Sequence, residues 1–164
     1  MINALIFTKL HIFPKNNQNA QKRTLMQTNT LPGIVKIQMV RCSDIQPHVM
    51  YASISGALVA LALPAVTIKF YGQPSLKWDG SIVNGSRQEK STLEFSTTEK
   101  LPEGEWLAFV LTVASGKQYL VGAREPKYPL INYTDTAGAP DGDAALRTYK
   151  ITHVAQKSVL PCVL

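Results

Sequence analysis

The feature that most constrains the fold is a series of short apolar runs separated by Gly, Pro, Asn and Asp. Residues 34–41 alternate, with Val35, Ile37 and Met39 on one predicted face that ends in Arg41, which fits a half-buried strand. About eight such runs recur at spacings of ~8–12 residues, and no segment sustains a period of 3.6. This pattern predicts an all-β fold, a sandwich or partly closed barrel of about eight short antiparallel strands.

Turn signals place most of these strands. Asn84-Gly85 is the strongest two-residue hairpin signal, and the clearest hairpin joins 106–113 to 118–123. A strand is also expected at 66–72, followed by a short one that ends in a turn at Asp79-Gly80. Further strands are predicted at 90–99, at 145–155, and after Pro129 within 126–134.

One short helix or 3₁₀ turn is expected within 42–54. Ser43 or Asp44 could cap it, and Pro47 could occupy its first positions.

The first 32 residues are predicted to be an extended arm or linker, and residues 33–164 a single β domain. Residues 1–30 contain four basic residues and no acidic one, a charge of +4, whereas residues 31–164 carry only +2. The basic character therefore belongs to the arm, and nucleic-acid binding by the folded domain is not expected.

The apolar run 54–66 is the main candidate for an interface. It is shorter than the ~20 residues of a bilayer span, and Pro64 interrupts it, so no membrane span is expected. It is either core or a surface between subunits. The interface candidates are Leu58, Val59, Leu61, Leu63 and Val66.

An acidic cluster, Asp135, Asp141 and Asp143, lies in a stretch rich in Gly and Pro. It does not fit a helix–loop–helix calcium site, because the twelfth position counted from Asp135 is Leu146. The three aspartates are therefore interpreted as turn and cap residues, with a bound cation as the weaker alternative.

The spacings of Cys42, His48, His153 and Cys162 do not match a structural zinc site. Two free buried thiols are expected, with a single disulfide as the alternative.

No catalytic signature is present. The chain contains neither a G-x-S-x-G elbow nor a phosphate-binding loop. A pair of glutamates could in principle hydrolyse glycosides, but surface positions explain these residues better. They are Glu94, Glu99, Glu103, Glu105 and Glu125. No enzyme activity and no cofactor are expected.

Aromatic residues are the remaining candidates for a binding face. Exposed aromatic rings could stack on a sugar, whereas Trp106 and Tyr119 are interpreted as core and cross-strand pairs of a hairpin. The full set is Trp78, Trp106, Tyr119, Tyr128, Tyr133 and Tyr149.

The C-terminal part of the chain resembles small structural proteins of tailed phages and prophages of gut Bacteroidales. The resemblance covers about the last 70 residues well and 33–100 loosely, and residues 1–30 are not part of it. The matching pieces are Leu107-Ala108-Phe109-Val110, 117–122, Tyr128-Pro129, 138–143 and 148–152.

This resemblance implies a β domain in a virion. Neck, tail or capsid-accessory proteins of this kind have exposed strand edges that neighbouring copies pair with. The expected function is non-enzymatic assembly, with other virion proteins and copies of the chain as partners. The first alternative is a β-sandwich module that binds carbohydrate or another cell-surface ligand, and the second is a β-barrel with a small-molecule cavity.

Overall fold

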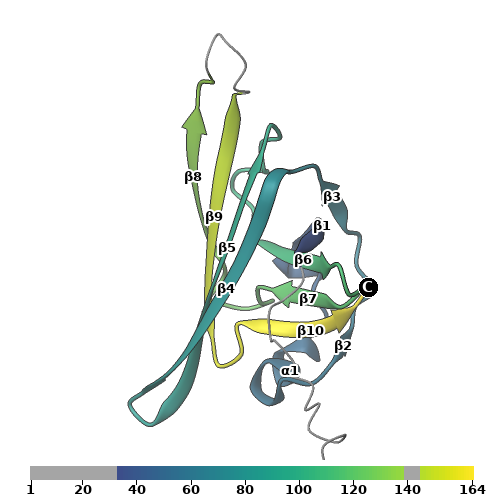
Figure 1. Ribbon diagram of the computed structural model, residues 1–164. Helices are drawn as coiled ribbons and strands as arrows, with labels where there is room; N and C mark the ends of the chain where they lie inside the picture. Colours follow the sequence, from purple (N-terminus) through teal and green to yellow (C-terminus); the bar gives the residue numbers. More distant parts are fainter. Residues whose placement is uncertain (1–32, 139–144) are drawn as a thin grey trace, which may run out of the picture. The chain divides into compact units, whose positions relative to one another are not determined.

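The computed structural model describes residues 33–138 and 145–164, which form two β-sheets and one short α-helix (Figure 1). The arm predicted for 1–32 and the residues Asp141 and Asp143 lie outside the described residues. The all-β class is confirmed. The described residues contain ten strands rather than about eight.

The first sheet has six strands in the order β2-β10-β7-β6-β1-β3. The predicted hairpin of β6 and β7 is confirmed, with Val110 opposite Leu120. One pair, β2 with β10, is parallel, so the sheet is not purely antiparallel as expected. The strands are β1 (Ile34–Arg41), β2 (Val59–Ala60), β3 (Val66–Ile68), β6 (Leu107–Val113), β7 (Gln118–Val121) and β10 (Val159–Val163).

The second sheet has four strands in the order β4-β5-β9-β8, all antiparallel. Asn84 and Gly85 both have positive φ, 50° and 74°, and join β4 to β5 as the sequence predicts. The turn predicted at Asp79-Gly80 is wrong, because β4 continues through both residues, which pair with Lys90 and Glu89. The strands are β4 (Tyr71–Val83), β5 (Ser86–Thr97), β8 (Leu130–Thr136) and β9 (Leu146–Ala155).

The strand predicted at 66–72 is divided, because the chain leaves one sheet for the other between Ile68 and Tyr71. The Thr97 hydroxyl donates a hydrogen bond of 2.6 Å to the Lys69 carbonyl at this crossing. Three further segments cross between the sheets, 98–106, 122–129 and 156–158. These crossings position most of the polar features described below.

The predicted helical segment contains a 3₁₀ turn, η2 (Cys42–Asp44), and the helix α1 (Val49–Ser55). The predicted capping is wrong, since the N-cap residues are Arg41 and His48 and neither makes a side-chain cap. Helix α1 ends at Gly56, whose left-handed conformation lets its N–H bond to the Ala52 carbonyl.

The main core lies between the two sheets, which makes the fold a sandwich. Ile37 and Phe109 of the six-stranded sheet pack with Leu93, Phe95 and Tyr149 of the four-stranded sheet. The Phe95 ring centroid lies 6.2 Å from that of Phe109, within the range of favourable aromatic pairs.

A second core covers the opposite face of the six-stranded sheet. Ala108, Val110 and Leu120 pack there against Val49 of α1 and Val59 of β2. Strand β6 is therefore buried on both faces, which explains why residues 107–111 are uninterruptedly apolar.

A β-bulge between Ile34 and Lys36 shifts the phase of β1. Ile34 and Ile37 are both buried as a result, whereas Val35 is 57% exposed and Met39 is half-buried. The predicted apolar face of Val35, Ile37 and Met39 is therefore wrong at Val35.

Candidate functional site

The residues expected at an interface lie in two different environments. Val59 and Leu61 are buried in the second core, which is the core alternative that the sequence left open. Leu63 is half-buried against the same cluster. Leu58 and Val66 are exposed, so only these two offer apolar surface.

The longer stretch of unpaired strand belongs to the four-stranded sheet. Within residues 33–138 and 145–164, strand β4 pairs only with β5 and strand β8 pairs only with β9, so both are edge strands of the described sheet (Figure 1). Strand β4 has 13 residues and β8 has seven, whereas the edge strands of the other sheet have only two and three. Long free edges expose backbone donors and acceptors to which another strand can bond.

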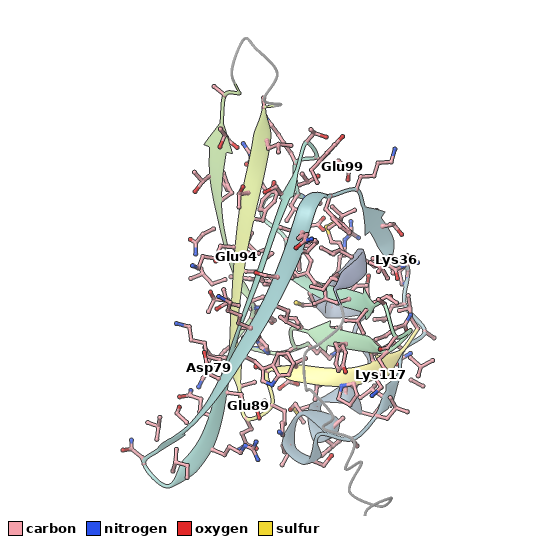
Figure 2. The ribbon with its side chains drawn as sticks, viewed as in Figure 1. Lys36, Asp79, Glu89, Glu94, Glu99 and Lys117 are labelled. Atoms are coloured by element: carbon pink, nitrogen blue, oxygen red, sulfur yellow. The ribbon has the colours of Figure 1, made fainter. Side chains whose placement is uncertain are left out.

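Exposed apolar side chains accompany both edges. On β4, Ile82 is 79% exposed and Trp78 and Val83 are also exposed, and on β8 so are Leu130 and Tyr133. The outer face of this sheet is otherwise polar and includes the ion pair of Lys150 with Glu94, a residue labelled in Figure 2.

Register shows which face these side chains occupy. Trp78 is opposite Ser91, and Ile82 is opposite Arg87. Directly opposed residues share a face, and alternate residues of β5, including Ser91 and Leu93, are buried. Trp78 and Ile82 therefore lie on the core-facing side of the sheet, yet Ile82 is exposed because the β4–β5 hairpin extends beyond the core there (Figure 1).

Asp135 is not a turn residue, contrary to the prediction, because it lies within β8 opposite Arg147 of β9. Two guanidinium nitrogens of Arg147 bond to its carboxylate, one of them at 2.6 Å. Hydrogen bonding to Arg147, together with the guanidinium charge, lowers the pKa of Asp135. Hydrogen bonding to the Asp135 carboxylate raises the pKa of Arg147. The guanidinium also lies over the Tyr133 ring, 4.1 Å from its centroid. Asp135, Arg147 and Tyr133 therefore form one surface cluster in which the Asp135 carboxylate is already bonded.

A cleft of about 460 Å³ lies where the crossing segments 98–106 and 122–129 approach the end of β1. Trp106 stacks on Tyr128 in this cleft, with ring centroids 4.6 Å apart and planes inclined by 20°. The prediction that Trp106 is a core residue of the hairpin is wrong. Trp106 comes directly before the first residue of β6, and it is 62% exposed. Tyr119, opposite Leu111, is the cross-strand residue that was expected.

Hydrogen bonds join the walls of this cleft. Arg41 donates to Glu105 at 2.8 Å, and the Cys42 N–H donates to the Trp106 carbonyl at 2.8 Å. Arg124 donates through Nη1 to the carbonyls of Ser43 and Ile45. The sequence pattern did not identify Arg41, Arg124 or the Arg41–Glu105 pair, because the partners are far apart in the chain.

Glu89 is a buried carboxylate on β5, four residues after the β4–β5 turn (labelled in Figure 2). Its oxygens accept from Lys157 at 2.7 Å, from Arg87 at 3.0 Å and from the Ser158 N–H at 3.3 Å. Burial raises the pKa of Glu89, but the Lys157 hydrogen bond and the surrounding positive charges outweigh it, so the pKa lies below its ordinary value. The Glu89 carboxylate therefore links β5 to the turn between β9 and β10 through hydrogen bonds.

His153 on β9 is buried and lines a second, smaller cavity of about 230 Å³ beside α1. Burial lowers the pKa of His153 to about 4, although a hydrogen bond to the Lys127 backbone partly opposes this. The imidazole is therefore neutral near pH 7. Its Nδ1 has no hydrogen-bond partner among the described residues.

Both cysteines are free thiols buried in the second core. Cys42 lies in η2, and Cys162 lies in β10. Burial raises the pKa of Cys42 to about 11 and that of Cys162 to about 12, which disfavours the reactive thiolate. Within 33–138 and 145–164, no three His, Cys, Asp or Glu side chains gather closely enough to hold a metal ion. Cys42, His48, His153 and Cys162 thus do not form a joint site.

Comparison with protein-family models, with curated proteins and with solved structures finds no match for this chain. Among the described residues, no helix is long and apolar enough to cross a membrane.

Proposed function

We propose that this chain is a non-enzymatic structural subunit of a phage particle and that it assembles by joining copies of itself edge to edge. The observation that carries the proposal is the pair of long free edges on one four-stranded sheet, β4 and β8. An edge of this length with exposed apolar side chains is a liability in an isolated monomer, and pairing with a neighbour removes it.

Strand direction is compatible with a head-to-tail arrangement. Neighbouring strands in the order β4-β5-β9-β8 alternate in direction, so β4 and β8 run opposite ways. A second copy in the same orientation would then present its β4 antiparallel to the β8 of the first. The sheet would continue unbroken across the junction, and a closed ring or a helical array would follow from the rotation between copies.

The charged side chains of the two edge strands would not repel each other at this junction. Strand β4 carries Lys77 and Asp79, which have opposite signs, and the Asp135 carboxylate of β8 is already bonded to Arg147. Apolar side chains on the two strands would lose exposed surface, which stabilises association.

The phage setting rests on the resemblance of residues 101–162 to small structural proteins of tailed phages. Two of its matching pieces lie in the β6–β7 hairpin, and another lies within β9, which pairs with the edge strand β8. The proposed partners are copies of this chain and other virion proteins of the neck, tail or capsid, and the proposed location is the virion.

The full chain would be measured by analytical ultracentrifugation across micromolar to millimolar concentrations. We expect oligomers that grow with concentration, and we expect Ile82→Lys on β4 or Leu130→Lys on β8 to weaken them, because an edge lysine must lose its hydration when another strand pairs. The matched control is Ser115→Lys, which adds the same charge at the exposed β6–β7 turn.

Mixing the two edge variants distinguishes the modes of association. In head-to-tail assembly, the intact β8 edge of Ile82→Lys pairs with the intact β4 edge of Leu130→Lys, so the mixture forms heterodimers that neither variant forms alone. If one variant alone still dimerises fully, the junction is two-fold symmetric and the head-to-tail arrangement is wrong. A parent chain that stays monomeric throughout contradicts edge association.

The virion assignment has its own test. Particles purified after prophage induction in the source bacterium would be examined by mass spectrometry, and we expect this chain at a fixed ratio to the major capsid protein. Its absence from particles, together with its presence in the cell lysate, would contradict a structural role in the virion.

A further inference from the structure

We infer that the cleft at Trp106 is a saccharide-binding site that takes a neutral pyranose ring. The site is separate from the edge strands β4 and β8, so it adds a ligand to the assembly role and does not depend on it. Its volume, about 460 Å³, lies within the range of about 300–1,000 Å³ that is typical of small-ligand pockets.

The aromatic pair provides the platform. Tyr128 is half-buried against the second core and stacks on one face of Trp106, which fixes the orientation of the indole. Trp106 nevertheless remains 62% exposed, so its opposite face is open to solvent. A rigid exposed indole beside a cleft suits the apolar C–H face of a sugar, because the contact needs little ordering of the side chain.

The cleft walls are held in place before any ligand arrives. Arg124 links the 122–129 crossing to the carbonyls of Ser43 and Ile45, and the Cys42 N–H bonds to the carbonyl of Trp106 itself. Three chain segments that line the cleft are thereby joined to one another, and binding would cost little conformational entropy.

The polar groups select the chemical class of ligand. The Arg41–Glu105 bond uses one guanidinium nitrogen and one carboxylate oxygen, so the pair keeps further donors and a further acceptor. Adjacent sugar hydroxyls donate and accept at the same time, and they can therefore bond to both members of the pair. An organic cation would be repelled by Arg41 and Arg124. A nucleotide phosphate would be attracted by these arginines, but Arg41 is already paired with Glu105, whose charge opposes that attraction, and Arg124 already donates to the carbonyls of Ser43 and Ile45.

The experiment uses the full chain on a glycan array, followed by calorimetric titration with the methyl glycoside of the best sugar. We expect Trp106→Ala to weaken binding roughly tenfold through loss of stacking. Glu105→Gln removes the charged acceptor and is expected to weaken binding while leaving the exposed indole in place. Tyr51→Ala on α1 is the matched control, because it removes another exposed aromatic ring outside the cleft.

Tryptophan fluorescence provides an independent readout, because the chain has two tryptophans. The sugar should change the emission of the parent but not that of Trp106→Ala, which retains Trp78. The inference is overturned if no neutral glycan binds the parent, if Trp106→Ala and Glu105→Gln both bind as the parent does, or if Tyr51→Ala loses binding equally. It is also overturned if a mononucleotide or choline binds the cleft more tightly than any neutral sugar.

Discussion

His153 is a titratable side chain held inside the protein in its neutral form. Burial lowers its pKa from 6.5 to about 4, so the unfolded chain binds a proton at a higher pH than the folded chain does. The free energy of unfolding is therefore unaffected by protonation of His153 above pH 6.5, and it decreases as the pH drops from 6.5 to 4. This interval lies largely above the pH at which carboxylates titrate.

Urea unfolding should show this dependence directly. Between about pH 7 and about pH 5 the free energy of unfolding is expected to fall by about 2 kcal/mol. His153→Gln lacks the titrating group, so its stability should change far less over the same interval, whatever its absolute value. Equal slopes in the parent and the variant would contradict the burial of a neutral imidazole.

Gly122 lies at a close approach between β7 and β6. It has a φ of 138°, and an added Cβ would lie only 3.0 Å from Ala108 Cα and closer still to Ala108 Cβ. Gly122→Ala is expected to destabilise the fold by about 3 kcal/mol or more, because the buried backbone of β6 cannot move aside.

Gly116→Ala is the control for backbone conformation, since Gly116 also has a positive φ but no atom of the described residues lies within 4 Å of its added Cβ. It should cost about 1 kcal/mol. Thermal unfolding of both variants measures the difference, and similar losses would show that crowding at Gly122 is unimportant.

At the scale of elements, the position of the turn sets the register of the β4–β5 hairpin. Gly85 has a φ of 74° in the two-residue turn, whereas Gly80 lies within β4 and has an ordinary backbone conformation. A Cβ at Gly80 would make only an ordinary contact of 3.8 Å with Glu89 Cγ. The two glycines therefore have different reasons to be present.

Gly85→Ala should destabilise the protein by about 1 kcal/mol, while Gly80→Ala should be close to neutral. The measurement is urea unfolding of both variants beside the parent. A larger loss in Gly80→Ala would instead support a turn at Asp79-Gly80 and would contradict the register of β4.

At the scale of the whole molecule, β6 connects the two cores. Phe109 points into the core between the sheets, and Val110 packs on the opposite face with α1 and β2. Because one strand contributes to both clusters, loss of either should destabilise the described domain as a unit.

Phe109→Ala is expected to lower the free energy of unfolding by about 3–5 kcal/mol. Val110→Ala should lower it by less, because fewer buried atoms are removed. In both variants, tryptophan fluorescence and far-ultraviolet circular dichroism should report the same single transition. Two separated transitions would contradict a shared core and indicate that the clusters unfold independently.

What the sequence by itself determined about this protein is its local structure. The Asn84-Gly85 turn, the β6–β7 hairpin and the strands β1 and β9 depend on contacts between residues near in sequence or on two-residue alternation, and both can be read from the chain. The mostly antiparallel β class follows from the number and spacing of such runs.

Only the tertiary structure decided the features that join distant residues. The bulge that exposes Val35, the passage of β4 through Asp79-Gly80 and the strand β10 with its Pro161 all depend on partners elsewhere in the sheets. The stacking of Trp106 on Tyr128 and the bond of Asp135 to Arg147 likewise bring together residues that sequence patterns treat separately. Local periodicity encodes where strands form, whereas long-range pairing determines their register, and with it which residues face a core and which polar and aromatic side chains meet at the surface.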